Sequence, residues 1–232
     1  MRTTAIVVAA GRGTRMQSPT AKAFVPLGGI PMLVYSLRTL SSVPSVEAIV
    51  LVVPQGQRRS GASVLRDAGP WRIPVVIIPG GPERQDSVAA GLARVSPTTE
   101  FVIVHDAARP FVTPDCVQRC LAAAAADGAA VAALPVRDTV KVVDAAGRIE
   151  RTLDRRRVWL AQTPQVFRAQ LLRQAYASAR HDAFAGTDDA ALVERLGVPV
   201  RAVEGDPDNR KLTTPEDLRW AERHLLAHPP GR

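Results

Sequence analysis

Cysteine, lysine and aromatic residues are all scarce in this chain of 232 residues. It has two cysteines, three lysines and only 4% aromatic residues. The cysteines, Cys116 and Cys120, are four residues apart in a segment with helical spacing, and the sequence holds no second cysteine pair to complete a metal site with them. The pair therefore predicts two small, buried helix residues and not a metal centre.

Long apolar runs are also missing. No stretch approaches the roughly 20 apolar residues that are needed to span a bilayer. The first apolar run, residues 5–10, is too short for the core of a signal peptide and leads directly into a glycine-rich loop. We therefore expect a cytoplasmic protein with no membrane segment. A composition of 46% hydrophobic and 22% charged residues suits one well-buried domain, and 232 residues leave little room for a second.

The net charge is +8, and nearly all of the excess comes from arginine. A basic chain raises the question of nucleic-acid binding. The arginines are scattered, however, and their densest cluster is the short run Arg155–Arg157. This distribution predicts a general attraction for anionic ligands and no specific nucleic-acid partner. The three lysines, Lys22, Lys141 and Lys211, each fall inside a motif that suggests phosphate chemistry.

Short apolar runs alternate with segments of helical spacing through the first 135 residues. The apolar runs cover residues 5–10, 48–53, 74–78, 101–104 and 129–135, and the helical segments cover residues 31–41, 57–68, 84–95 and 114–126. The runs are too continuous for strands with one wet face, so they predict buried parallel strands. The alternation predicts an α/β fold, a Rossmann-like mostly parallel sheet flanked by helices, with ligands bound at the loops after the strands.

The pattern changes after residue 135. Alternating valines and a tight turn at residues 144–147 lie in the segment 136–161, which predicts a β-arm that protrudes from the domain. Because such an arm has little core of its own, we expect a second subunit to pack against it in a homodimer. The rest of the chain predicts helices at 168–180 and 188–196, a strand at 198–204 and a helix at 215–226. The chain is thus interpreted as one domain, residues 1–232, with an arm at about 136–161.

The loop at residues 9–16 lacks two common nucleotide-binding signatures. Met16 stands where the dinucleotide fingerprint needs its third glycine, and no G-x-x-x-x-G-K-[ST] sequence is present. What remains is a glycine-rich turn with Arg12 and Arg15, followed by Lys22. Glycines allow backbone amides to approach a phosphate chain, and cations neutralise it. The loop alone predicts either a nucleoside triphosphate site or a plain connection with solvated arginines.

The loop resembles the signature A-A-G-x-G-x-R-[ML], followed by a lysine, of nucleotidyltransferases that activate sugars and polyols. Six further motifs follow in order, at residues 80–88, 104–110, 136–141, 162–165, 187–190 and 209–213. Together they resemble the 2-C-methyl-D-erythritol 4-phosphate cytidylyltransferases of the non-mevalonate isoprenoid route, over nearly the whole chain. The loop departs from that family in two respects: Ala21 stands where proline is frequent, and Ala23 and Phe24 stand where an amide is frequent.

The resemblance implies a reaction and a cofactor. The enzyme would transfer CMP from CTP to 2-C-methyl-D-erythritol 4-phosphate and release pyrophosphate, with Mg²⁺ as cofactor. The nucleophile is a phosphate monoester with a second pKa of about 6, so it is already ionised and needs no general base. His105 is therefore interpreted as structural. Catalysis must overcome the electrostatic repulsion between two polyanionic substrates. Cationic side chains and a metal ion neutralise this charge.

The resemblance also implies roles for particular residues. Catalysis is assigned to Arg15, Lys22, Asp106 and Lys211, with Asp106 as the ligand of Mg²⁺. CTP binding is assigned to Ala9, Ala10, Gly11, Gly13, Gly80, Gly81 and Ser87. Binding of the acceptor is assigned to Arg109, Thr139, Arg155, Thr163 and Lys211, with Arg155 reaching the site of a neighbouring subunit from the arm. A helix-capping role for Ser87, and a role for Asp106 as a cap or as a partner of Arg109, stay open.

Three alternatives remain open from the sequence. A sister enzyme would use ribitol 5-phosphate as the acceptor with nearly the same nucleotide loops. A uridylyl- or guanylyltransferase would need a different base loop at residues 80–87. A non-enzymatic module that binds nucleotides or nucleic acid through its basic surface would show salt-dependent oligonucleotide binding and no turnover.

Overall fold

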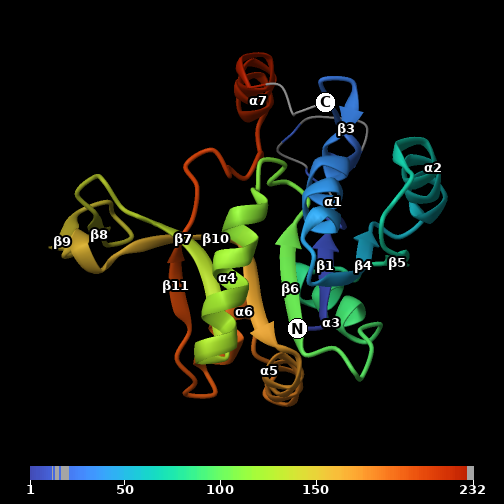
Figure 1. Ribbon diagram of the computed structural model, residues 1–232. Coiled ribbons are helices and arrows are strands. Elements are labelled where there is room, and N and C mark those ends of the chain that lie inside the picture. Colours follow the sequence, from blue (N-terminus) through green and yellow to red (C-terminus); the bar gives the residue numbers. More distant parts are fainter. Residues whose placement is uncertain (12, 14–15, 17–20, 229–232) are drawn as a thin grey trace.

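The computed structural model describes residues 1–11, 13, 16 and 21–228. At its centre is a seven-stranded sheet with the strand order β11-β7-β10-β6-β1-β4-β5 (Figure 1). The strands are β1 (Thr3–Val8), β4 (Val46–Val53), β5 (Val75–Pro79), β6 (Phe101–Asp106), β7 (Ala129–Pro135), β10 (Trp159–Arg168) and β11 (Arg201–Glu204). Only β10 runs antiparallel to its neighbours in this sheet, so the predicted mostly parallel α/β fold is confirmed.

Helices cover both faces of the sheet (Figure 1). One face packs against α1 (Met32–Ser42), α2 (Arg58–Ala68) and α4 (Pro114–Asp127), and the other against α3 (Arg84–Leu92), α5 (Ala169–His181) and α6 (Asp189–Glu194). Along β1 the side chains alternate: Ala5 and Val7 join the first core, and Ile6 joins the second. Strands buried on both faces explain why the apolar runs are continuous in the sequence.

A third, smaller core lies near the carboxyl edge of the sheet. It joins α7 (Pro215–Ala227) to the short strands β2 (Pro26–Leu27) and β3 (Ile30–Pro31), with Leu27, Met32 and Leu212 fully buried in it. α7 begins at a capping box, in which Thr214 accepts a hydrogen bond from the backbone of Asp217. None of the helices in the described part of the chain is both long and apolar enough to cross a membrane.

The strand β10 is absent from the sequence prediction, which placed the arm up to residue 161 and a helix from 168. Its centre reads Gln-Thr-Pro-Gln, and proline is normally excluded from central strands because it cannot donate to the ladder. The pairing of β10 with β7 shifts register between Ala161 and Gln165, which accommodates Pro164. The buried polar side chains of Gln162, Thr163 and Gln165 all have hydrogen-bond partners. Tertiary hydrogen bonding thus supports a strand that its composition argues against.

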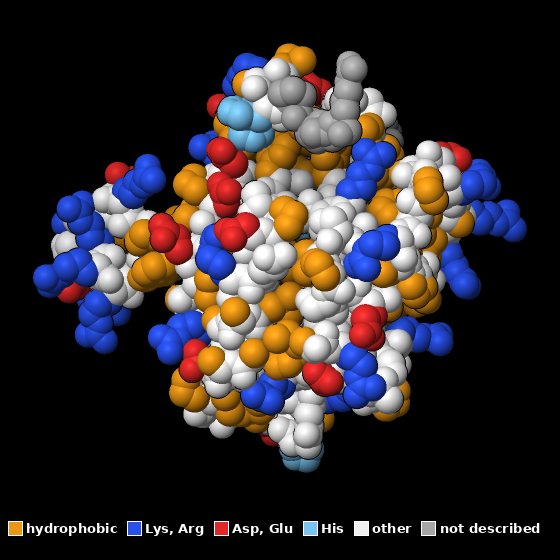
Figure 2. Space-filling view, viewed as in Figure 1, with side chains coloured by type: hydrophobic (Ala, Val, Ile, Leu, Met, Phe, Trp, Pro, Cys, Tyr) orange, Lys and Arg blue, Asp and Glu red, His pale blue; other side chains and the backbone are white. Residues whose placement is uncertain are grey.

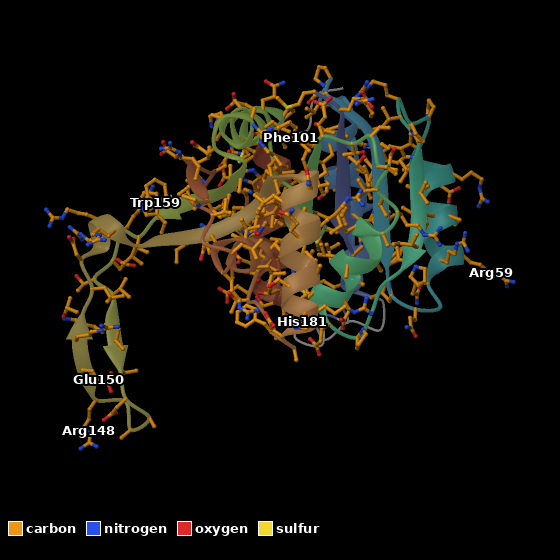
Figure 3. The ribbon with its side chains drawn as sticks, turned by 90° about the horizontal axis from the view of Figure 1, so that it is seen from below. Arg59, Phe101, Arg148, Glu150, Trp159 and His181 are labelled. Atoms are coloured by element: carbon orange, nitrogen blue, oxygen red, sulfur yellow. The ribbon has the colours of Figure 1, made fainter. Side chains whose placement is uncertain are left out.

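The segment after β7 leaves the body of the molecule as an arm (Figures 1 and 3). Its hairpin pairs β8 (Lys141–Val143) with β9 (Ile149–Thr152) in antiparallel fashion. The turn is closed by Asp144, whose Oδ1 accepts hydrogen bonds from the backbone nitrogens of Ala146 and Arg148, both at 2.9 Å. A single 3₁₀ turn, η3 (Arg155–Arg157), then leads into β10.

Candidate active site

A cleft with a volume of about 490 Å³ opens at the carboxyl edge of the sheet. Its walls come from positions at the ends of parallel strands: Val8 ends β1, Pro54 follows β4, and Asp106 ends β6. The cleft is lined by Val8, Ala9, Ala10, Gly11, Gly13, Lys22, Ala23, Pro54, Gln55, Gly81, Pro82, Glu83, Arg84, Ser87, Asp106, Ala108, Lys211 and Thr213. This is the edge at which open α/β sheets bind their ligands.

The glycine loop after β1 brings its backbone close to Lys22. Gly13 has a φ of +64°, and a Cβ added to it would lie 2.4 Å from the Cβ of Lys22, so only glycine fits here without a shift. Lys22 begins the 3₁₀ turn η2 (Lys22–Phe24) and lines the cleft. Arg12 and Arg15, the predicted cations of the loop itself, lie outside the described residues.

One of the two departures from the family pattern, Ala23 with Phe24, occupies core positions, and the other, Ala21, is partly buried against the same core. Ala23 and Phe24 are buried, and both join the larger core beneath the cleft. Lys22 therefore sits on a packed base although no proline precedes it.

Gly80, Gly81 and Ser87 form a tight corner between β5 and α3. A Cβ at Gly80 would lie 2.5 Å from the Cβ of Ala10 and 2.6 Å from the Oγ of Ser87. The backbone nitrogen of Gly81 donates to the Oγ of Ser87 at 3.2 Å. The N-cap of α3 is Glu83, four residues earlier than Ser87, so a capping role for Ser87 is wrong. The Ser87 side chain, 1% exposed, faces the cleft and the glycines.

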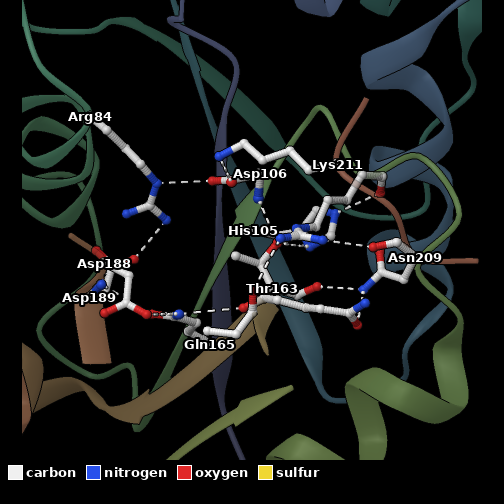
Figure 4. A network of polar contacts seen from close by, with 12 residues as sticks. Arg84, His105, Asp106, Thr163, Gln165, Asp188, Asp189, Asn209 and Lys211 are labelled. Atoms are coloured by element: carbon white, nitrogen blue, oxygen red, sulfur yellow. Dashed lines mark hydrogen bonds and ion pairs between the residues drawn. The ribbon is translucent and has the colours of Figure 1, made fainter. Parts of the chain in front are cut away.

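Asp106 lies between two cations at the floor of the cleft (Figure 4). Its Oδ1 accepts a hydrogen bond from Nε of Arg84 at 3.0 Å, and its Oδ2 lies 2.6 Å from Nζ of Lys211. Burial alone would raise the pKa of Asp106. The charges of Arg84, Lys211 and Arg109 outweigh burial and hold this pKa well below its usual range. Asp106 is thus ionised near neutral pH, and it forms ion pairs with Arg84 and Lys211.

An ionised carboxylate at this position suits Mg²⁺, which favours one or two carboxylates together with phosphate oxygens and water. Within residues 1–11, 13, 16 and 21–228, no group of three or more His, Cys, Asp or Glu side chains gathers to hold a metal. Asp106 therefore fits a metal that takes most of its ligands from a bound triphosphate and from water.

Arg84 was not assigned a role from the sequence, although it stands inside one of the seven motifs. Besides Asp106 it pairs with Asp189, whose Oδ2 lies 2.8 Å from Nη2 of Arg84. Burial acts to lower the pKa of Arg84, but the two carboxylates outweigh this effect and raise it. Asp189 is 105 positions away in the chain, and no local pattern links it to Arg84.

His105 and Thr163 lie behind Asp106, away from the cleft (Figure 4). The Oγ1 of Thr163 accepts from the backbone nitrogen of Asp106 at 3.1 Å and lies 3.0 Å from Nδ1 of His105. Nε2 of His105 is 3.1 Å from the carbonyl oxygen of Arg109. Burial lowers the pKa of His105 to about 4, so the ring is neutral near pH 7. The structural interpretation of His105 agrees with this full burial.

The predicted acceptor residues fall into two groups. Arg109 and Thr163 lie beside Asp106, where Nη1 of Arg109 donates to the carbonyl of Asn209 at 2.8 Å and its Nε has no partner among the described residues. Thr139 and Arg155 are exposed on the arm, and Nη1 of Arg155 donates to the carbonyl of Arg137 at 2.8 Å. Among the described residues, the structure therefore brings all those predicted to bind CTP or the metal into one cleft except Gly80, which lies behind Ala10 and Ser87, and it leaves the arm residues apart from the cleft.

Comparison with known proteins decides the family. Residues 3–227 match the sequence profile described as "2-C-methyl-D-erythritol 4-phosphate cytidylyltransferase". The chain belongs to this family. A cytidylyltransferase of that name from Syntrophus aciditrophicus is 47% identical over 225 residues, which cover 95% of this chain and 94% of the relative. One from Pelotomaculum thermopropionicum is 44% identical over 223 residues, with 96% and 94% of the two chains covered.

Solved structures agree with this family assignment. The 2-C-methyl-D-erythritol 4-phosphate cytidylyltransferase of Thermus thermophilus is 36% identical, with a TM-score of 0.78 over 97% of this chain and all of the other. The 4-diphosphocytidyl-2C-methyl-D-erythritol synthase of Anaerococcus prevotii is 29% identical, with a TM-score of 0.86 and with 97% and 98% of the chains covered. The family predicted from the ordered motifs is confirmed, and the ribitol phosphate and non-enzymatic alternatives are not favoured.

Proposed function

We propose that the cleft at the carboxyl edge of the sheet holds CTP and 2-C-methyl-D-erythritol 4-phosphate for direct transfer of CMP. The phosphate of the acceptor attacks the α-phosphorus of CTP, and pyrophosphate leaves. The product is 4-diphosphocytidyl-2-C-methyl-D-erythritol, an isoprenoid precursor. The observation that carries this assignment is Asp106, ionised between Arg84 and Lys211 and facing the glycine loop across one cleft.

The cytosine end of CTP is assigned to the corner of Gly80, Gly81 and Ser87, with the backbone of Ala9 and Ala10 opposite. The close approach of Gly80 to Ala10 and Ser87 leaves no room for even one added methyl group. Backbone groups and the one hydroxyl at this corner can recognise a pyrimidine edge. The amides of Gly11 and Gly13 are assigned to the phosphate chain.

Cations on two sides of the cleft are assigned to the phosphates. Lys22 approaches from the loop after β1, and Lys211 from the segment before α7. Arg15 is proposed as a third cation on the sequence motif alone. These groups stabilise the charge that builds up on the α-phosphate and on the leaving pyrophosphate. Because the acceptor phosphate is already ionised, no base is needed, and the neutral, buried His105 is consistent with this chemistry.

Asp106 is the residue that we propose holds Mg²⁺. The metal, when bound, neutralises charge on the triphosphate. The task of the chain is to keep the Asp106 carboxylate ionised and turned toward the cleft, which its low pKa and its two cationic partners support.

The arm is proposed to complete the acceptor site of a second copy of this chain. Thr139 and Arg155 are exposed and do not line the cleft of their own chain. Val143, Ile149 and Leu160 expose more than half of their surface, and Lys and Arg side chains gather over the same arm (Figure 2). An apolar and basic arm of this kind suits contact with a partner subunit that holds anionic substrates. We also propose a homodimer acting in the cytoplasm, where CTP is available.

Calorimetric titration in Mg²⁺ tests the nucleotide assignment. CTP should bind with heat release. The Kd of UTP, ATP and GTP should be higher than that of CTP by roughly tenfold or more, because the loss of one hydrogen bond produces a change of about this size. The Ser87→Ala variant should narrow the difference between CTP and UTP. Equal binding of all four nucleotides by the wild-type protein would contradict the assignment of cytosine recognition to this corner.

A further inference from the structure

The two cations that hold Asp106 differ in how firmly they are fixed. The Lys211 side chain is 41% exposed, and its ammonium forms an ion pair with Asp106. The Arg84 side chain is 27% exposed and forms ion pairs with Asp106 and Asp189 at once. Both cations face the space in which a triphosphate would bind. Lys211 can therefore turn to an incoming phosphate more easily than Arg84 can.

Asp189 is built to keep Arg84 in place. Its side chain is fully buried, and it is not among the residues that line the cleft. The hydroxyl of Tyr176 donates to Oδ1 of Asp189 at 2.5 Å, which leaves Oδ2 for Arg84. Burial and the neighbouring charge of Asp189 raise the pKa of Tyr176, so this hydroxyl remains a donor. The carboxylate is thus aimed at Arg84 from behind.

The backbone around Asp189 is held as well. The Oε1 of Gln165 accepts from the nitrogens of Asp189 and Ala190 at 3.1 and 3.0 Å, and its Nε2 donates to Asp188 at 2.8 Å (Figure 4). Gln165 belongs to β10, next to β6, which carries Asp106. The Gln165 side chain therefore ties the start of α6, with Asp189, to the strand next to the one that carries Asp106.

We infer that Arg84 is a positioning residue for Asp106 and that Asp189, with Tyr176, holds Arg84 back from the triphosphate. Arg84 keeps Oδ1 of Asp106 engaged, while Lys211 can turn from Oδ2 to a phosphate, so that Oδ2 would be available to hold a divalent cation. This inference rests on the proposed function of the cleft. Groups that orient a metal-binding carboxylate in this way typically change metal affinity or activity by roughly 10- to 100-fold when they are removed.

The competing role for Arg84 is direct binding of the triphosphate, and the two roles differ in what Asp189 does. If Arg84 binds phosphate, Asp189 competes with the ligand, and Asp189→Asn should improve CTP binding. If Arg84 positions Asp106, Asp189 supports the reaction, and Asp189→Asn should impair it. The sign of the Asp189→Asn effect therefore separates the two roles.

The test compares Arg84→Gln, Asp189→Asn and the double variant with the wild-type enzyme. Steady-state kinetics with CTP and the acceptor give kcat and KM, and titration of Mn²⁺ by electron paramagnetic resonance, with a non-hydrolysable CTP analogue, gives metal affinity without turnover. We expect Arg84→Gln to lower kcat and Mn²⁺ affinity by roughly 10- to 100-fold, with a smaller change in KM for CTP. Asp189→Asn should act in the same direction, and the double variant should be no worse than Arg84→Gln.

Two further variants sharpen the test. Tyr176→Phe removes only the hydroxyl that aims Asp189, and it should lower both kcat and Mn²⁺ affinity, by less than Asp189→Asn does. Arg84→Lys keeps the charge, but one ammonium cannot span two carboxylates, so it should recover only part of the loss. Arg173→Gln is the matched control, because Arg173 donates to the carbonyls of Val95 and Ser96 and contacts no carboxylate in this set. It should leave kcat and metal affinity unchanged.

The outcomes separate this inference from the proposed function. Unchanged kcat and Mn²⁺ affinity in Asp189→Asn and Tyr176→Phe, or a lower KM for CTP in Asp189→Asn, would overturn the positioning role while the wild-type enzyme still turns over. A wild-type enzyme that does not turn over would instead overturn the proposed function. Circular dichroism shows whether each variant is folded, and the single-atom change Tyr176→Phe provides a test even if Arg84→Gln does not fold.

Discussion

Adding one methyl group at Gly80 tests how tightly the base corner is built. In Gly80→Ala the new Cβ would lie 2.5 Å from the Cβ of Ala10, 2.6 Å from the Oγ of Ser87 and 3.2 Å from Cγ1 of Val52. Real carbon contacts of this kind lie beyond about 3.4 Å, so the loop after β1, α3 and β4 would all have to yield. The φ of Gly80 is not in the left-handed region, so alanine adds crowding and no backbone strain.

The magnitude follows from overpacking. Inserting a methyl group into a packed site costs typically about 1–3 kcal/mol. For a chain of this size each kcal/mol lowers Tm by about 2–4 °C, so we expect Gly80→Ala to lower Tm by about 4–8 °C for a central value of about 2 kcal/mol. The base corner would also open, so KM for CTP should rise. A thermal melt followed by circular dichroism and a CTP titration measure the two effects separately.

Two controls isolate the cause. Gly11→Ala adds a Cβ that would meet no atom of the described residues within 4 Å, so its Tm should stay at the wild-type value. The double variant Gly80→Ala with Ser87→Ala removes the hydroxyl from the crowded corner, so it should regain part of the lost Tm while CTP binding stays weak. A wild-type Tm together with wild-type CTP affinity in Gly80→Ala would refute the argument that this corner is close-packed and reads the base.

The remaining predictions concern charge, metal, pH and assembly. Lys22→Met keeps the stem that packs against the glycine loop but removes the ammonium, so kcat should fall roughly 10²–10³-fold without a change in Tm; a near-normal kcat contradicts the phosphate role. Asp106→Asn should shift the Mg²⁺ titration of activity to higher concentration, and an unchanged titration contradicts the metal role. Burial lowers the pKa of His105 to about 4, below its unfolded value of about 6.5, so the stability from the neutral ring is complete above pH 6.5 and falls toward pH 4. In EDTA, the free energy of unfolding measured in urea should fall by about 2 kcal/mol more between pH 8 and pH 5 in the wild type than in a His105→Asn variant. The same fall in both proteins would refute this role of His105. Light scattering should give twice the chain mass of 24.8 kDa, Ile149→Asp on the arm should lower both mass and activity, and a fully active monomer would refute the shared site.

Strands of the sheet could be predicted where several consecutive residues are apolar. β1, β4 and β6 are largely buried on both faces, so each contains a continuous apolar run, at residues 5–8, 48–53 and 101–104. β10 could not be predicted in the same way. Its buried centre carries glutamines, a threonine and a proline, and these are stable there only because partners from distant segments satisfy them, such as Asp188 and Asp206.

The site shows the same division. Asp106 and Lys211 could each be singled out from a motif, and the structure brings them to 2.6 Å. The pairing of Arg84 with Asp189 joins two elements that are far apart in the chain, and no periodicity encodes such a contact. The role of Thr163 also depends on the fold, since its hydroxyl contacts the backbone of Asp106 and the His105 ring and does not line the cleft. Local patterns thus identify which residues matter, and the fold determines what they touch.

Pyrophosphate release tests the central claim most directly. The purified chain, with Mg²⁺, is assayed with CTP, UTP, ATP and GTP, each against 2-C-methyl-D-erythritol 4-phosphate and ribitol 5-phosphate. We predict rapid release with CTP and the methylerythritol phosphate, and little with any other pair. Release with ribitol 5-phosphate as the preferred acceptor would contradict the acceptor assignment, and no release from any pair by a folded sample would contradict the catalytic role of the cleft.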